Sequence, residues 1–237
     1  EALTAGRSTG QDLVVAVASL GLGQVHAAQL ENSKAIEFYS EAMDIFVRND
    51  TEPGKAATLI ASGQVYYDQS EYEKATSSFQ EALEIYTRLG YEIGRANALL
   101  DLGRSPAAQS RLDEAIDSYT QARNIYMQIG HHLGRANASR ELGEAFRKKS
   151  EWSEAQTYFE DARDYYGRVG NELGIGKTLH GLGDVYDATA EYEKASAAYE
   201  EAQPVFARIG RPLGRANALA ALMPLRIREG RFQEAMS

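Results

Sequence analysis

Four histidines are the residues of this chain that could serve catalysis or metal binding: His26, His131, His132 and His180. No histidine stands at metal-ligand spacing from a second histidine or a carboxylate, and the sequence contains no cysteine. The glycines do not cluster into a phosphate-binding loop. The sequence therefore predicts a protein that is not an enzyme and that has no catalytic residue, metal site or cofactor. The pair His131-His132 is expected to be a solvated part of a loop.

Hydrogen bonding to a peptide backbone is a second kind of chemistry, for which Asn97, Asn137 and Asn217 are candidates. Each lies in nearly the same segment, which reads GRANAL at residues 94–99 and 214–219 and GRANAS at residues 134–139. A side-chain amide donates and accepts hydrogen bonds at once, as binding to a peptide backbone requires. Whether these amides can act together depends on the elements that hold them.

The segments recur at a constant interval of forty positions. Gly134 follows Gly94 after one such interval, and Gly214 follows Gly134 after two. The copy expected between them is present as GIGKTLHGLG from residue 174, and earlier copies begin at Gly54 (GKAATLIASG) and Val14 (VVAVASLGLG). A period of about 20–50 residues indicates a solenoid or related repeat architecture, in which no single unit buries its apolar face alone.

Each unit is predicted to be a pair of antiparallel helices. In the unit that begins at Gly94, residues 94–109 have apolar residues at helical spacing, and residues 112–129 carry a second apolar stripe. Gly130 follows, where a helix can end in a left-handed residue, and Gly90, Gly170 and Gly210 are its equivalents. Asn49-Asp50 takes this place in the first unit. No alternating strand pattern is present, so the predicted fold class is all-α.

Small and aromatic residues recur at fixed offsets within these units. Glycine recurs at Gly23, Gly63, Gly103, Gly143 and Gly183. Alanine follows twelve positions later at Ala35, Ala75, Ala115, Ala155 and Ala195, and an aromatic residue sixteen positions later at Tyr39, Phe79, Tyr119, Phe159 and Tyr199. Two helices approach closely only where their side chains are small, and we expect the aromatic rings to fill the wider gaps.

This series resembles the tetratricopeptide repeat over essentially the whole chain. Leu-Gly pairs such as Leu102-Gly103, and an aromatic residue three positions later as at Phe146 and Tyr186, match its usual pattern. The usual unit has about 34 residues, so this chain is similar to the longer subclass of Pins/LGN-type polarity scaffolds and of arrays attached to some fungal and bacterial signalling NTPases. The resemblance implies a right-handed α-solenoid, a superhelix of tandem antiparallel helix pairs with the first helices on its concave face.

We expect one solenoid domain that is divided at this period. Its predicted parts are the end of a preceding repeat's second helix at 1–13, repeat 1 at 14–53, repeat 2 at 54–93, repeat 3 at 94–133, repeat 4 at 134–173, repeat 5 at 174–213 and a partial repeat 6 at 214–237. Because both ends fall inside second-helix patterns, we expect the chain to be part of a longer protein.

Composition disfavours two classes of partner. The formal net charge of -9 argues against nucleic acid, because affinity for phosphates comes largely from Lys and Arg. The apolar residues 13–22 are fewer than the ~18 that a membrane span needs, and they are interpreted as part of the first helix of repeat 1 and not as a signal peptide. We expect a cytoplasmic protein with no nucleic-acid or membrane partner.

The resemblance also implies which residues line the concave groove, namely those six and three positions before the repeat glycine and one, four and five after it. The expected groove residues are Val17, Leu20, Gln24, Ile60, Gln64, Tyr67, Asn97, Leu100, Arg104, Asn137, Arg140, Arg147, Lys148, Lys177, His180 and Asn217. They are mostly apolar in the N-terminal half and basic in the middle. The lysine and asparagine pair with which short-form domains clamp a chaperone tail is absent.

The sequence therefore predicts a non-enzymatic scaffold whose groove binds a protein or peptide segment with apolar and acidic residues. One alternative is a regulatory sensor array of a larger signalling NTPase, and another is an end-to-end assembly module. Val15 and Val17 are apolar where later units have Arg95 and Asn97. Apolar residues at positions that usually face water suggest cover by the residues before Gly10, by an upstream repeat or by another molecule. We therefore expect weak self-association through the repeat ends.

Three prolines interrupt the predicted helices: Pro106, Pro204 and Pro224. A proline in a helix interior removes a backbone hydrogen bond and usually kinks the helix. We expect local deviations from the repeat geometry at these positions.

Overall fold

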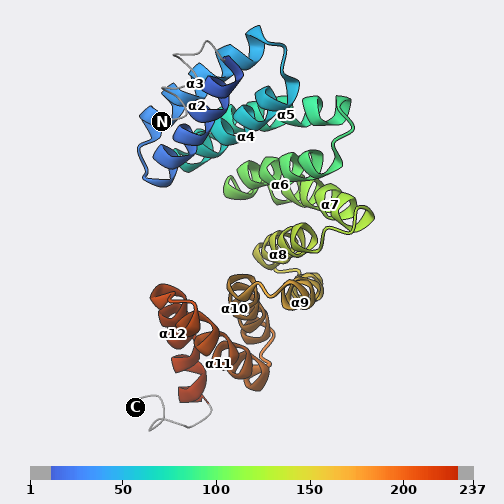
Figure 1. Cartoon of the computed structure of the whole chain (residues 1–237). Coiled ribbons are helices and arrows are strands. Elements are labelled where there is room, and N and C mark those ends of the chain that lie inside the picture. The colour runs from blue at the N-terminus through green and yellow to red at the C-terminus, as the bar shows by residue number, and fades with distance from the viewer. Residues whose placement is uncertain (1–11, 229–237) are drawn as a thin grey trace. The chain divides into compact units, whose positions relative to one another are not determined.

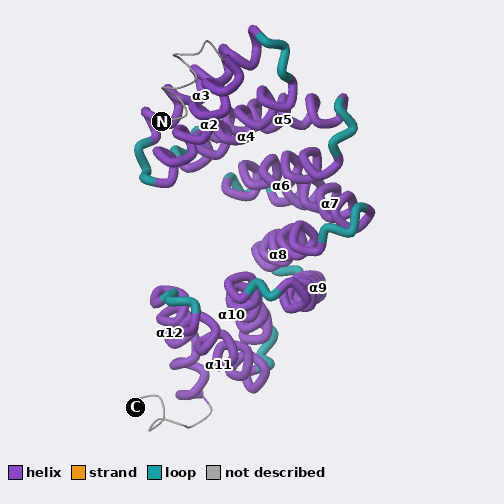
Figure 2. The backbone as a smooth tube through the Cα atoms, in the orientation of Figure 1, coloured by secondary structure: helices purple, strands orange, loops and turns teal. Residues whose placement is uncertain are grey.

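The computed structural model describes residues 12–228, and these residues form eleven α-helices joined by short loops, with no strand among them (Figures 1 and 2). The first helices of the pairs are α2 (Asp12–Ala28), α4 (Glu52–Asp68), α6 (Glu92–Ala108), α8 (His132–Lys148), α10 (Glu172–Ala188) and α12 (Pro212–Arg228). The second helices are α3 (Asn32–Arg48), α5 (Tyr72–Arg88), α7 (Leu112–Gln128), α9 (Trp152–Val169) and α11 (Tyr192–Arg208). The all-α fold of tandem helix pairs is confirmed.

The first helices begin two residues before the glycine that was expected to open each unit. At α8 and α10 the residue before the helix caps it, because the side chains of His131 and Asn171 each accept a hydrogen bond from the backbone N–H of the glycine three positions later, at 3.0 Å and 2.8 Å. Helices α4 and α6 begin at the same register without a side-chain cap. Such a cap satisfies one of the free N–H groups of a helix start. His131 is thus a capping residue and not the solvated loop residue that was expected.

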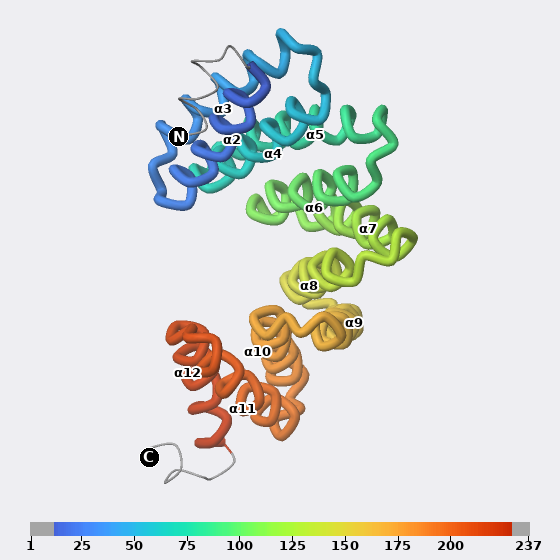
Figure 3. The backbone as a smooth tube through the Cα atoms, in the orientation of Figure 1, coloured from blue at the N-terminus to red at the C-terminus, as the bar shows by residue number. Residues whose placement is uncertain are grey.

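The chain forms two compact units, residues 1–118 and 119–237, whose boundary lies inside α7. Within the N-terminal unit, each helix from α2 to α6 packs on the next, and the first helices α2, α4 and α6 also contact one another in that order. Within the C-terminal unit, α8 to α12 pack in the same way, and α10 contacts both α8 and α12. Figure 3 traces the succession of helix pairs along the chain. Adjacent first helices therefore lie side by side in each unit.

An aromatic ring from the second helix lies directly against the repeat glycine of the first helix. A Cβ atom placed on Gly143 would lie 2.7 Å from Cδ1 of Phe159, and one on Gly183 would lie 2.5 Å from Cε1 of Tyr199. The pairs Gly23–Tyr39 and Gly63–Phe79 repeat this contact. The expectation that the rings fill wider gaps is wrong, because each ring occupies the space that the missing side chain leaves.

A second contact of the same kind joins consecutive pairs and explains the glycine of the GRANAL segments. Gly174 at the start of α10 lies against the ring of Tyr166 on the preceding helix α9. The same contact joins Gly54 to Phe46, Gly94 to Tyr86, Gly134 to Tyr126 and Gly214 to Phe206. Glycines thus let aromatic rings hold a first helix from both of its neighbouring second helices.

The predicted left-handed residues are found where the second helices end. Gly90, Gly130, Gly170 and Gly210 have φ values of 65°, 68°, 68° and 65°, and Asp50 has a φ of 50°. The turn inside each pair also contains a residue with a left-handed backbone conformation. The sequence analysis missed these residues because none of them is a glycine. These residues are Leu30, Ser70, Ser110, Ser150 and Ala190. Such residues adopt this conformation at a cost, which the tight turn must offset.

The three prolines do not shorten the helices that contain them. The helices α6, α11 and α12, which contain Pro106, Pro204 and Pro224, each keep the 17 residues of their counterparts. Pro106 is buried and stands two residues before the end of α6, so the lost hydrogen bond affects only the last turn.

Val15 and Val17 have different surroundings, although both were expected to need cover. Val15 is 6% exposed and packs with Ala42, Ile45 and Phe46 of α3, so its position faces the second helix of its own pair and not water. Val17 is 62% exposed. The expected helix end before residue 12 and the residues after 228 lie outside the described residues, so self-association through the ends stays a prediction.

The glycine contact predicts that Gly143→Ala lowers the free energy of unfolding by about 1–3 kcal/mol, because the new methyl group overpacks the site. Phe159 is fully buried and cannot move aside. The matched control is Gly167→Ala on α9, which has nothing within 4 Å of the new Cβ and should stabilise the protein by up to about 1 kcal/mol. Chemical denaturation measures both.

A second protein background tests whether contact with the Phe159 ring causes this loss of stability. In a Phe159→Leu chain, Gly143→Ala should cost less than in the wild type, because the smaller side chain leaves room for the methyl group. An equal cost in both backgrounds would show that the ring is not the cause.

Candidate functional site

Three of the expected groove residues of the N-terminal unit contact neighbouring side chains of α4 and α6. Gln64 on α4 donates to Asp101 on α6 at 3.3 Å, and Arg104 forms an ion pair with the same carboxylate at 3.3 Å. The Arg104 guanidinium also lies 4.3 Å from the centre of the Tyr67 ring. These side chains join α4 to α6.

The remaining expected residues of that unit have varied surroundings. Leu20 and Ile60 are half-buried and pack against the apolar core, and Leu100 is half-buried as well. Val17, Gln24 and Asn97 are exposed. None of them lines the cavity of the C-terminal unit described below.

In the C-terminal unit, Asp184 on α10 is the centre of a polar cluster. It lies 3.4 Å from Arg147 of α8 and 3.5 Å from His180, and it accepts a hydrogen bond from the Tyr199 hydroxyl at 2.7 Å. Arg147 also pairs with Glu144 at 2.8 Å. The cluster ties α8, α10 and α11 together. His180 thus pairs with a carboxylate one helical turn away, which corrects the sequence analysis.

This cluster shifts the pKa values of its members. Burial opposes the charge of Asp184, but hydrogen bonds with His180 and Tyr199 and the charge of Arg147 lower its pKa overall. The hydrogen bond with Asp184 raises the pKa of His180 above its ordinary value, against an opposing effect of burial. Burial and the same carboxylate raise the pKa of Tyr199. Folding therefore favours the protonated form of the His180 ring.

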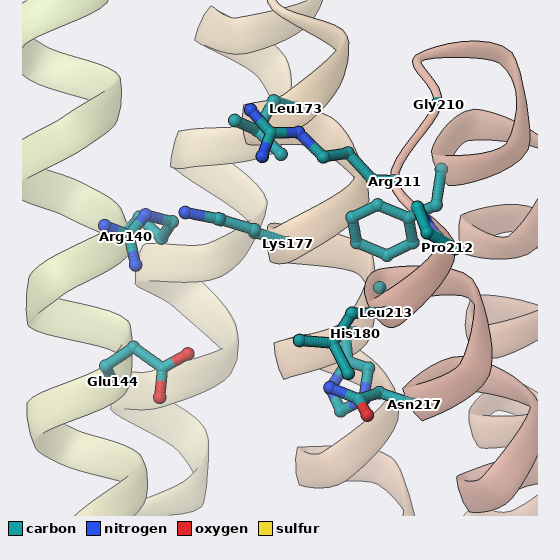
Figure 4. Close-up of a pocket in the computed structure, with 12 residues that line it drawn as sticks. Arg140, Glu144, Leu173, Lys177, His180, Gly210, Arg211, Pro212, Leu213 and Asn217 are labelled. Carbon is teal, nitrogen blue, oxygen red and sulfur yellow. The ribbon is translucent and has the colours of Figure 1, made fainter. Parts of the chain in front are cut away.

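Beside this cluster lies a cavity of about 660 Å³ (Figure 4). Its walls come from α8, α10, α11, α12 and the loop before α12. The lining residues are Arg140, Glu144, Leu173, Lys177, His180, Phe206, Gly210, Arg211, Pro212, Leu213, Gly214 and Asn217. Four of them, Arg140, Lys177, His180 and Asn217, are residues that the sequence analysis expected in the groove.

Positive charges gather at the upper wall of the cavity as Figure 4 shows it, where the Lys177 side chain extends toward Arg140 and that of Arg211 lies above it. Arg140 is ion-paired with Glu141. Lys177 and Arg211 make no side-chain hydrogen bond or ion pair within residues 12–228. The pKa of Lys177 is lowered, first by its partial burial and then by the positive charges of Arg140 and Arg211. An anion in the cavity would relieve this repulsion.

Three further expected residues of this unit differ in their surroundings. Asn137 accepts a hydrogen bond from the Tyr166 hydroxyl at 2.7 Å, which leaves its amide N–H groups available. Lys148 is exposed and does not line the cavity. Asn217 lines the cavity from α12 and is exposed.

The sequence analysis missed Arg211 and the apolar wall. Arg211 occupies the position where His131 and Asn171 cap their helices, but a guanidinium has no acceptor atom and cannot cap. A basic residue at a capping position was the signal that could have indicated a free side chain. The apolar wall is formed by Leu173, Phe206, Pro212 and Leu213. These residues come from the first turns of α10 and α12 and from the second helix α11, which the groove register does not include.

The described residues contain no group of three or more histidine, aspartate or glutamate side chains that could hold a metal ion. None of the helices described is long and apolar enough to cross a membrane. What the geometry supplies is a concave, partly apolar surface with unneutralised cations.

Helix pairs at a forty-residue period, with glycines packed against aromatic rings, define a solenoid of the tetratricopeptide class. The family model of the tetratricopeptide repeat matches residues 13–88, 94–168 and 137–208. The chain therefore belongs to the tetratricopeptide repeat family. No curated protein matches it.

Solved structures share this fold at low sequence identity. BtubC from P. vanneervenii is 19% identical with a TM-score of 0.70, covering 86% of this chain and 82% of that one. A signal transduction ATPase with a tetratricopeptide repeat sensor from Pyrococcus horikoshii is 17% identical with a TM-score of 0.79, covering 94% of this chain and 35% of that one. The Rap conjugation regulator of plasmid pLS20, in complex with the Phr* peptide, is 19% identical with a TM-score of 0.74, covering 96% and 64%.

The Asp184–His180 contact predicts a pH-dependent contribution to stability. Because the folded-state pKa of His180 is raised above 6.5, its contribution is full below pH 6.5 and is lost as the pH rises through the folded value. The difference in the free energy of unfolding between wild type and His180→Gln should therefore shrink over that range, as denaturation at several pH values would measure.

NMR titration of the His180 ring gives an independent reading. Asp184→Asn should move its pKa down toward the ordinary value, because the neutral amide no longer stabilises the imidazolium. A His180 pKa that does not respond to this change, or a stability difference that grows with pH, would contradict the assignment.

Proposed function

We propose that the chain is a non-enzymatic binding module that holds a peptide or a protein segment with acidic and apolar residues along the first helices of its C-terminal unit. The observation that carries this proposal is the cavity beside α8, α10 and α12, where Lys177 and Arg211 stand without counter-ions next to an apolar wall. The Rap regulator that shares the fold binds a peptide, which supports the same class of ligand here.

The charge distribution favours this surface over the second helices. Helix α8 carries two more basic than acidic residues, α10 carries Lys177 against Glu172, Asp184 and Asp187, and α12 carries three arginines and no acidic residue. The three first helices together are therefore basic. The whole chain nevertheless has a formal net charge of -9. An acidic segment would therefore be attracted to these first helices and repelled by most of the remaining surface.

A sensor role within a larger signalling protein is the second candidate. It is favoured by the fold shared with the repeat sensor of the Pyrococcus horikoshii ATPase, of which this chain matches 35%. In that role, the same cavity would bind a small effector or another part of the parent protein.

The proposal is tested with peptides selected from a phage-displayed random library against the whole chain and measured by fluorescence anisotropy. Lys177→Glu should weaken the selected acidic peptides by at least about tenfold, because it replaces an attraction with a repulsion. Binding to the wild type should also weaken as the salt concentration rises.

The matched control is Lys194→Glu, the same charge reversal at an exposed lysine of the second helix α11. It should change the affinity by less than about twofold. Peptides that lose affinity with Lys194→Glu and keep it with Lys177→Glu would place the binding surface on the second helices and refute the proposal.

A further inference from the structure

The cavity combines unpaired cations with an apolar wall. Lys177 and Arg211 form no ion pair within residues 12–228, Arg140 adds a third positive charge beside them, and the nearby Glu141 offsets part of this charge. Like charges held together raise the free energy of the unoccupied cavity, and a bound anion would lower it.

An apolar wall stands next to these cations. Pro212 and Leu213 begin α12, and with Leu173 and Phe206 they line the same cavity. Leu213 is 74% exposed, which is unusual for leucine and leaves apolar area to be covered. A ligand that joins an anionic group to an apolar group would contact both walls at once.

The volume and the charges of the cavity further restrict the class of ligand that it can bind. The cavity volume of about 660 Å³ lies within the usual range for small-ligand sites. Glu144 also lines the cavity, and its negative charge would repel a dianion more strongly than a monoanion. The exposed amide of Asn217 at the edge could bind a backbone or an acyl amide.

We propose that this cavity is a subsite for a carboxylate joined to a short apolar group, as in the C-terminal residue of a peptide or in a small free acid. The inference rests on the proposed binding function of these first helices and names the group that they select. The carboxylate accepts hydrogen bonds from Lys177 and Arg211 while the apolar group packs against Leu173, Phe206 and Leu213.

Four small probes test this chemistry on the whole chain by NMR chemical-shift titration: N-acetyl-leucine, N-acetyl-leucinamide, octanoate and inorganic phosphate. N-acetyl-leucine should bind at least about tenfold more tightly than its amide, because the amide lacks the charged acceptor. Phosphate, which has no apolar group, should bind more weakly than N-acetyl-leucine. Equal binding of acid and amide, or tighter binding of phosphate, would overturn the subsite.

Substitutions of cavity residues test where the small probes bind. Lys177→Gln and Arg211→Gln should each remove most of the preference for acid over amide. The control Lys194→Gln removes a lysine of α11 that is exposed and outside the cavity, and it should leave the preference unchanged. Because all three positions are exposed, circular dichroism should show the same helix content in each variant. A preference that survives Lys177→Gln and Arg211→Gln would overturn the assignment.

The two sources of the carboxylate are separated by extending the probe. If the natural ligand is a peptide, acetyl-Ala-Ala-Leu as a free acid should bind more tightly than N-acetyl-leucine, because Asn217 can reach the added backbone. Tighter binding of octanoate than of the tripeptide would assign the site to a free acid.

These experiments can contradict the carboxylate subsite without contradicting the proposed binding function. Library peptides that require Lys177 but bind equally as free acids and as C-terminal amides would overturn the subsite and leave the binding module intact. If neither peptides nor probes respond to Lys177, both proposals are wrong.

Discussion

Contact between a glycine and an aromatic ring is the constraint on which the rest of this structure depends. A first helix presents one glycine to the ring of its own second helix, as at Gly143 and Phe159, and another to the ring of the preceding pair, as at Gly174 and Tyr166. A ring seated on a glycine sets the distance and the register of the helices together. Because both contacts recur at the forty-residue period, each successive helix pair packs on the preceding one through the same two contacts.

The register that these contacts fix also arranges the groove. Since adjacent first helices lie side by side in each unit, their exposed side chains meet in rows. Charged side chains in these rows pair within the protein, as where Arg104 meets Asp101 and where Arg147 meets Asp184. Lys177 is different, because it forms no ion pair among the described residues and two of its charged neighbours, Arg140 and Arg211, are cations, with Glu141 opposing them. The proposed ligand site lies where this pairing fails.

The period, the pairing of helices and the left-handed glycines such as Gly130 could be predicted from the sequence, because each depends on residues that recur at one spacing. The candidate site could be predicted only in part. Lys177 and His180 follow from the groove register, whereas Arg211 and Phe206 enter the cavity from a loop and from a second helix. Val15 was misjudged for a related reason, since its position faces the partner helix whether the residue is valine or arginine.

The ionisation of Lys177 tests the central claim, that this cavity is built for an anion, most directly. In a chain labelled with lysine carrying ¹³Cε, and with the signal assigned by Lys177→Arg, NMR titration gives the pKa of this amine in the free and the ligand-bound protein. The account predicts a pKa below the ordinary 10.5 in the free protein and a rise on binding of an acidic peptide or of N-acetyl-leucine. A free-state pKa at or above the ordinary value, or one that does not rise with ligand, would contradict it.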